Sequence, residues 1–143
     1  MIVKRLIAAI ITGVELDSYK MTLAAVIENA HPDVANGLTS EIEPSLLKGL
    51  SQRENEYVLI ACLDLSGVMF RKFGDTIRRE PHLIDNERFR ECLFTLLTSN
   101  NASLSKRSST ALGFFSTILS KEELNNLICK LFVCINGCRD KTE

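Results

Sequence analysis

Apolar residues recur every three or four positions along most of the chain, which is the period of an α-helix with one buried face. In the segment from Asn86 to Leu97, Phe89 is followed by apolar residues three, four, seven and eight positions later. A second such segment runs from Leu104 to Leu119. The residues 98–103 between them are typical of turns and helix N-caps. The two segments therefore predict a pair of amphipathic helices joined by a short polar connection.

The same pattern predicts five further helices. The last of them begins with Ser120 and Glu123, the spacing of a capping box in which each side chain accepts a hydrogen bond from a free backbone N–H. Asp17 or Ser18 is the expected N-cap of the second helix. No segment alternates apolar and polar residues between turn signals, so no strand is expected. The five predicted ranges are 2–12, 18–30, 40–50, 55–73 and 120–135.

Glycine and proline predict where these helices end. Gly13 and Gly74 follow apolar stripes and are expected to act as stop signals. Pro32 ends the second helix, because the residue before a proline disfavours the α conformation. Pro44 is tolerated only in a first helical turn, which predicts a late start for the third helix. The residues 75–85 are then the longest connector.

The predicted helices recur at a regular spacing. The positions 11–13, 50–52 and 97–99 resemble one another at steps of 39 and 47 residues. Leu23, Leu63 and Leu112 are separated by 40 and 49 residues, so a second marker agrees. Paired helices at about 40–47 residues are typical of HEAT and armadillo repeats. The expected fold is therefore all-α: an α-solenoid of HEAT/armadillo-type helical hairpins, with about three repeats and seven helices.

This spacing places one HEAT-repeat domain at residues 1–135 and a frayed tail at 136–143. The first helix is expected to be the second helix of an incomplete repeat, so both ends of the stack should expose apolar flanks. Solenoids normally need terminal repeats with a polar outer face. The expectation is either a fragment of a longer solenoid or self-association through the uncapped ends. The repeat pieces are 1–14, 17–52, 55–99 and 103–135.

Composition excludes several other classes. The 143 residues are 45% hydrophobic and 24% charged with a net charge of −1, so no overall positive field recruits nucleic acid. No apolar stretch is long enough to span a membrane. Five cysteines without a C-x-x-C pair suit reduced thiols in the cytoplasm or nucleus. Cys129, Cys134 and Cys138 have poor spacing for zinc and no histidine nearby, so no metal and no cofactor are expected.

Catalysis finds no support in the sequence. His31 and His82 lie beside prolines in predicted connectors, without a motif that supplies a nucleophile or a partner acid. No phosphate-binding glycine loop or zinc-protease motif is present. The chain is therefore expected not to be an enzyme.

Two passages resemble a known family. The residues 93–99, followed by 105–113, are similar to a leucine-rich helix, Leu-Thr-Ser, basic pair and Ala-Leu-Gly passage in cullin-associated, neddylation-dissociated (Cand) proteins. The residues 61–64 and 71–74 resemble the preceding repeat of that family, and weaker similarity covers about residues 2–132. The resemblance implies a HEAT solenoid that binds a cullin–RING ubiquitin ligase scaffold and exchanges substrate receptors. This chain is too short to wrap a cullin, so it would supply one end of that binding interface.

Basic residues are the expected protein-binding groups. In HEAT arrays the second helix of each pair usually lines the concave face, and here the sequence assigns that role to the first, third, fifth and seventh helices. An acidic partner is expected along one edge of the solenoid, with a cullin and its RING subunit as the partner that the resemblance implies. Two alternatives stay open: a generic adaptor of importin or phosphatase-scaffold type, and a truncated remnant without independent activity. The candidate binding residues are Lys48, Arg88, Arg90, Glu91 and Lys130, with Lys106 and Arg107 at the start of the sixth helix.

Overall fold

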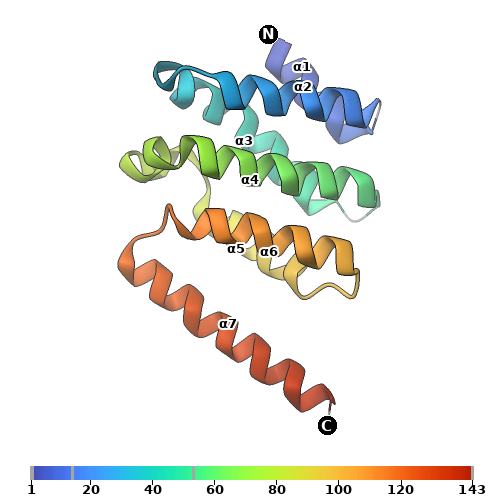
Figure 1. Ribbon diagram of the computed structural model, residues 1–143, viewed down its shortest axis with the longest axis vertical. Coiled ribbons are helices and arrows are strands. Elements are labelled where there is room, and N and C mark those ends of the chain that lie inside the picture. Colours follow the sequence, from blue (N-terminus) through green and yellow to red (C-terminus); the bar gives the residue numbers. More distant parts are fainter. Residues whose placement is uncertain (1, 14, 53, 143) are drawn as a thin grey trace.

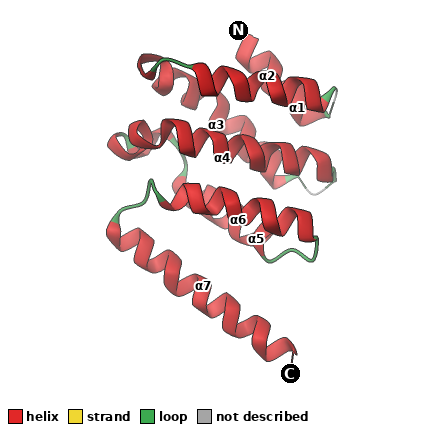
Figure 2. Cartoon of the chain, viewed as in Figure 1, coloured by secondary structure: helices red, strands yellow, loops and turns green. Residues whose placement is uncertain are grey.

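The computed structural model describes the backbone of residues 2–13, 15–52 and 54–142, and the side chains of these residues except 2 and 137–142. In this part of the chain the regular structure is entirely helical, with seven α-helices and two short 3₁₀ helices (Figure 2). The α-helices are α1 (Ile2–Thr12), α2 (Leu16–Asn29), α3 (Ala35–Ser51), α4 (Glu56–Arg79), α5 (Asn86–Leu97), α6 (Ala102–Ser116) and α7 (Lys121–Thr142), and the 3₁₀ helices are η1 (Pro32–Val34) and η2 (Pro81–Leu83).

The helices stack in two layers. Helix α1 packs against α2, α3 against α4, and α5 against α6, and these three hairpins follow one another along the long axis (Figure 1). Helices α2, α4 and α6 form one layer, while α1, α3 and α5 form the other. Helix α7 follows the last hairpin and diverges from α6 toward its C-terminal end. This arrangement is compatible with an α-solenoid, as the apolar stripes predicted.

The hairpins lie one helix earlier in the chain than the predicted repeat pieces. The pieces 17–52, 55–99 and 103–135 join α2 to α3, α4 to α5 and α6 to α7. Among helices that are consecutive in the chain, however, the extensive packing is within α1–α2, α3–α4 and α5–α6. The physical reason lies in two connectors. Both 30–34 and 80–85 contain a proline and a 3₁₀ helix, and each carries the chain on to the next hairpin.

Helix α3 begins five residues earlier than predicted, at Ala35 rather than Ser40, and Pro44 lies inside it. Proline inside a helix removes one backbone hydrogen bond and costs roughly 3 kcal/mol. The cost is outweighed here because Thr39, Ile42 and residues of the following turns are buried on both sides of Pro44, while Pro44 itself faces solvent. Tertiary packing has overridden the local signal.

Helix α4 continues through Gly74, so the predicted stop signal at this glycine is wrong. Gly74 is buried, and a Cβ atom there would meet the Ile118 side chain at 3.5 Å. It is therefore a position of close helix packing. Ile77, one turn later, is also buried and keeps the helix against the core up to Arg79. The predicted connector 75–85 is mostly helix and η2.

Several helix ends also differ by a few residues. Helix α2 begins at Leu16, after a residue with left-handed backbone (Glu15, φ 43°), so neither Asp17 nor Ser18 is its N-cap. Helix α6 runs from Ala102 to Ser116 rather than from 104 to 119. These differences lie at helix ends, where a local sequence gives the weakest signal.

Other local predictions are confirmed. Helices α1 and α5 have the predicted bounds, and the capping box of α7 forms with two 3.2 Å hydrogen bonds between Ser120 and Glu123. Helix α7 extends to Thr142, beyond the predicted end at 135. The predicted fraying of 136–143 falls largely outside the residues whose side chains are described, and it stays a prediction.

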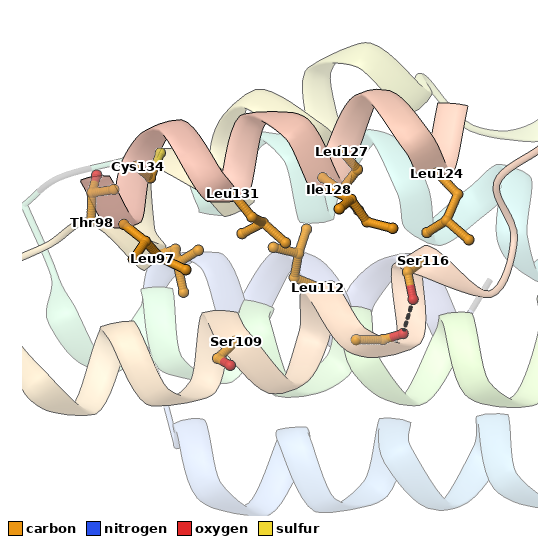
Figure 3. Close-up of a pocket in the computed structure, with 12 residues that line it drawn as sticks. Leu97, Thr98, Ser109, Leu112, Ser116, Leu124, Leu127, Ile128, Leu131 and Cys134 are labelled. Carbon is orange, nitrogen blue, oxygen red and sulfur yellow. Dashed lines mark hydrogen bonds between the residues drawn. The ribbon is translucent and has the colours of Figure 1, made fainter. Parts of the chain in front are cut away.

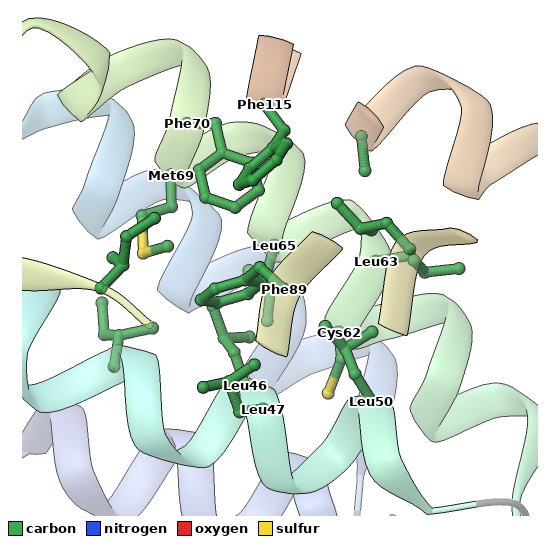
Figure 4. Close-up of a cluster of buried hydrophobic side chains, with 14 of the residues drawn as sticks. Leu46, Leu47, Leu50, Cys62, Leu63, Leu65, Met69, Phe70, Phe89 and Phe115 are labelled. Carbon is green, nitrogen blue, oxygen red and sulfur yellow. The ribbon is translucent and has the colours of Figure 1, made fainter. Parts of the chain in front are cut away.

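Three phenylalanines form the centre of the core. The Phe70 ring of α4 lies 5.2 Å from both the Phe89 ring of α5 and the Phe115 ring of α6, in edge-on geometry at 79° and 63° (Figure 4). All three side chains are fully buried. Edge-to-face aromatic pairs add to the stabilisation from buried area alone. The apolar core is continuous from Ile7 in α1 to Leu127 in α7, so it ties the stacked hairpins together.

Candidate functional site

The outer surface of the layer formed by α2, α4 and α6 carries an ionic contact that spans all three helices. One carboxylate oxygen of Asp64 in α4 lies 2.5 Å from the Lys20 ammonium of α2 and 2.5 Å from the Arg107 guanidinium of α6. These three residues are 43 and 44 positions apart in the sequence. Asp64 therefore links three successive hairpins across one surface, which we call the α2/α4/α6 face.

More basic residues lie on the exposed sides of α4 and α6. Arg71 pairs with Glu28 of α2. The Arg78 guanidinium lies 3.4 Å from Asp75 and donates a 3.0 Å hydrogen bond to the Thr117 carbonyl. Lys72 and Lys106 are exposed and make no ion pair among the described residues. Their charges are available to a partner.

A hollow of about 570 Å³ lies on this face beside Asp64, at the start of α6. The Lys106 ammonium and the Arg107 guanidinium are its cationic groups. Ser103 adds a hydroxyl donor, whereas the Thr110 hydroxyl already donates to the Lys106 carbonyl. Guanidinium and ammonium groups beside hydroxyls suit a carboxylate or another anionic side chain of a protein partner. The lining residues are Asp64, Ala102, Ser103, Lys106, Arg107 and Thr110.

The predicted binding residues divide between the two layers. Lys106 and Arg107 lie together on the α2/α4/α6 face. Lys48 of α3, with Arg88 and Glu91 of α5, is exposed on helices of the other layer. The structure therefore brings together only part of the predicted set.

Two of the predicted binding residues hold α7 in place. The Arg90 guanidinium lies 3.0 Å from the Asn86 side-chain oxygen and 3.3 Å from Glu123 of α7. The Lys130 ammonium lies 4.6 Å from the centre of the Phe94 ring, which is a cation–π contact. Both side chains join α5 to α7. The Arg90 charge is paired with Glu123, whereas Lys130 is exposed and makes no ion pair among the described residues.

Sequence reasoning missed Lys20 and Asp64. Each is a single charge on a helix surface, and neither belongs to a charged run. Only the stacking of α2, α4 and α6 reveals that they meet. The alternation of helices between two layers could have supplied a signal, because it makes α2, α4 and α6 neighbours, and the spacings of 44 and 43 residues between Lys20, Asp64 and Arg107 match the repeat.

The side chains considered for catalysis do not lie together, and their surroundings do not activate them. His31 and His82 are both exposed, on the connectors around η1 and η2, and the His31 ring lies 3.3 Å from the Asp33 carboxylate. Burial raises the pKa of the Cys62 thiol to about 12, which keeps it protonated and unreactive. Within the described residues, no cluster of three or more His, Cys, Asp or Glu side chains is placed to hold a metal ion. The Cys138 side chain lies outside them.

Glu43 of α3 gives the fold an expected pH dependence. Partial burial raises the pKa of its carboxyl above 4.5, and the nearby Asp85 carboxylate adds to the rise while Arg88 opposes it. The protonated form is therefore favoured by folding, and its stabilisation is lost as the pH rises through the raised pKa. Glu43→Gln, which resembles the protonated group, is expected to increase the free energy of unfolding above that range and to change it little below pH 4.5.

The measurement is urea unfolding on both sides of that range. Glu91→Gln is a matched control, because it removes the same charge from an exposed position on α5. Equal effects of the two substitutions at neutral pH would contradict the role of partial burial at Glu43.

In the part of the chain that the structure describes, no helix combines the length and the apolar character needed to cross a membrane.

Comparisons with known proteins leave the family open. No protein-family model, no curated protein and no solved structure matches the chain.

Proposed function

We propose that the chain is a non-enzymatic, protein-binding scaffold of HEAT type, and that an acidic partner docks on its α2/α4/α6 face. The observation that carries the proposal is the ionic contact of Lys20, Asp64 and Arg107. It joins one helix from each of three hairpins, so a single partner surface would reach all three. The hollow beside it supplies cationic and hydroxyl donors.

The hairpin assignment favours this face over the other layer. In HEAT arrays the second helix of each pair usually lines the concave, partner-binding side. With α1–α2, α3–α4 and α5–α6 as the pairs, the second helices are α2, α4 and α6. Lys106 and Arg107 therefore remain binding candidates, whereas Lys48 and Arg88 belong to the first helices.

The proposed partner is a cullin with its RING subunit. The support is the resemblance of residues 93–99 and 105–113 to the Cand family, together with the basic character of the α2/α4/α6 face. In this proposal the chain contributes one end of a Cand-type contact in the cytoplasm or nucleus. Substrate-receptor exchange would need further repeats at the far end of such a solenoid.

The test is direct binding of the purified chain to a purified cullin–RING complex that lacks its ubiquitin-like modifier. Lys106→Glu is expected to raise the dissociation constant about tenfold, because a like charge then faces the acidic partner. Lys48→Glu makes the same change on α3 and is expected to leave binding as it is. Higher salt should weaken wild-type binding and reduce the difference between the two variants.

Two results would contradict the proposal. Absence of wild-type binding would reject the cullin–RING partner and favour an adaptor of another kind. A loss of binding with Lys48→Glu but not with Lys106→Glu would reject the α2/α4/α6 face. Circular dichroism of both variants confirms that the fold is kept.

A further inference from the structure

An apolar groove of about 770 Å³ lies between α6 and α7, with the end of α5 at one side. Figure 3 shows Leu124, Leu127 and Leu131 of α7 facing Leu112 and Ser109 of α6 across this space. The groove is independent of the basic residues on the α2/α4/α6 face. The remaining lining residues are Leu97, Thr98, Gly113, Ser116, Ile128, Cys134 and Ile135.

Helix α7 contacts α5 along one side, and its other side is exposed to solvent. Glu123 and Lys130 hold it to α5 through Arg90 and Phe94. Lys130 is also the single charged residue between positions 124 and 136. A helix with so wide an apolar surface is normally packed on two sides. Four large apolar side chains of α7 are exposed instead: Ile128 (42%), Phe132 (63%), Val133 (70%) and Ile135 (54%).

The stacking of the helices shows that the groove lies where a further helix would pack against α6. Helices α4 and α6 begin alike, with Asn55 and Asn101 each accepting hydrogen bonds from two backbone N–H groups. Aligning these caps pairs Gly67 with Gly113. A Cβ atom at Gly67 would meet Phe114 of α6 at 3.6 Å, whereas one at Gly113 would meet nothing within 4 Å. The glycine position at which α4 packs closely against α6 thus has a counterpart on α6 at which no neighbouring helix lies.

We propose that a second copy of this chain fills the groove, with α7 of each copy lying in the groove of the other around a two-fold axis. The vacant place needs a helix with an unpartnered apolar side, and α7 is the helix of the described chain that exposes one. The exposed side chains of Ile128, Phe132 and Ile135 form a ridge along α7, and Ile128 and Ile135 are also one wall of the groove, so one face carries both halves of the contact. A two-fold interface requires such a self-complementary face.

Size and charge agree with this occupant. Helix α7 has 22 residues and is about 33 Å long, which is enough to lie along the whole of α6, whose 15 residues span about 23 Å. Lys130, the one charged residue of the stretch 124–136, lies over the Phe94 ring of α5 and does not line the groove, so the groove itself carries no charge that would select an ionic partner.

The test is sedimentation equilibrium of the full chain over a range of concentrations, and the expected result is a monomer–dimer equilibrium. Phe132→Glu changes an exposed ridge residue and is expected to raise the dimer dissociation constant about thirtyfold, as for a hot-spot residue. Gly113→Phe places a ring in the groove from an exposed position where a Cβ atom would meet nothing within 4 Å, and it should have a similar effect. Met21→Glu, at a 72% exposed position on α2, is the matched control and should leave the dimer intact.

A wild-type chain that is monomeric at every concentration would overturn the proposal, and the groove would then take another kind of partner. A dimer that survives both Phe132→Glu and Gly113→Phe would place the contact elsewhere and overturn it equally. Open-ended assemblies in place of a closed dimer would exclude the two-fold arrangement. Circular dichroism monitors folding, and Gly113→Phe decides the outcome if Phe132→Glu does not fold.

Discussion

Phe70→Ala is expected to lower the free energy of unfolding by about 3–5 kcal/mol, the usual cost of removing a fully buried aromatic ring from a core. Phe70 lies in α4 and contacts Phe89 of α5 and Phe115 of α6. Its removal takes away two edge-on aromatic contacts at once and leaves a cavity between two hairpins. The loss therefore weakens the stacking of the hairpins as well as the core of one of them.

Urea unfolding followed by circular dichroism measures this effect. Tyr57→Ala is a suitable control, because Tyr57 is an aromatic residue of the same helix with 73% of its surface exposed. A change within about 0.5 kcal/mol is expected there. A loss at Phe70 no larger than that at Tyr57 would show that the three rings do not hold α4, α5 and α6 together.

The sequence predicted best those features that depend on a few consecutive residues. The bounds of α1 and α5 follow from apolar stripes with clear ends, and the capping box at Ser120 depends on side chains three positions apart. Pro44 and Gly74 were misread because their neighbours in space decide their roles. Pro44 lies on an exposed side of a helix that is buried elsewhere, and Gly74 lies against Ile118.

The pairing of helices was harder to predict than the helices themselves. An apolar stripe shows that a helix is covered on one face, but it does not identify the helix that covers it. The same limit explains the candidate site. Lys106 and Arg107 are adjacent in sequence and were predicted together, whereas Lys20 and Asp64 meet Arg107 only through stacking. Arg90 and Lys130 look equally free in the sequence, yet Arg90 of α5 pairs with Glu123 of α7, and Lys130 of α7 lies over the Phe94 ring of α5.

Close packing at Gly49 gives the second large expected effect. Gly49 is buried in α3, and a Cβ atom there would overlap the Sγ atom of Cys62 in α4. Cys62 is fully buried, so its sulfur has little room to move. Gly49→Ala is therefore expected to lower the free energy of unfolding by about 1–3 kcal/mol, the usual cost of overpacking a core. In an unhindered helix, replacing glycine by alanine would instead stabilise by about 0.5–1 kcal/mol.

A Gly→Ala substitution is expected to change the free energy of unfolding in opposite directions at two positions of α3, so the two variants can be compared directly. Gly37 lies in the same helix with nothing within 4 Å of a Cβ atom, so Gly37→Ala is expected to stabilise the protein. Cys62→Ala removes the sulfur that Gly49→Ala would meet, so the double variant should recover most of the loss. The coupling between the two sites, measured by urea unfolding of all four proteins, then reports the contact of α3 with α4 directly. If Gly49→Ala and Gly37→Ala stabilise alike, the two helices are further apart than the structure places them, and the pairing of α3 with α4 would have to be abandoned.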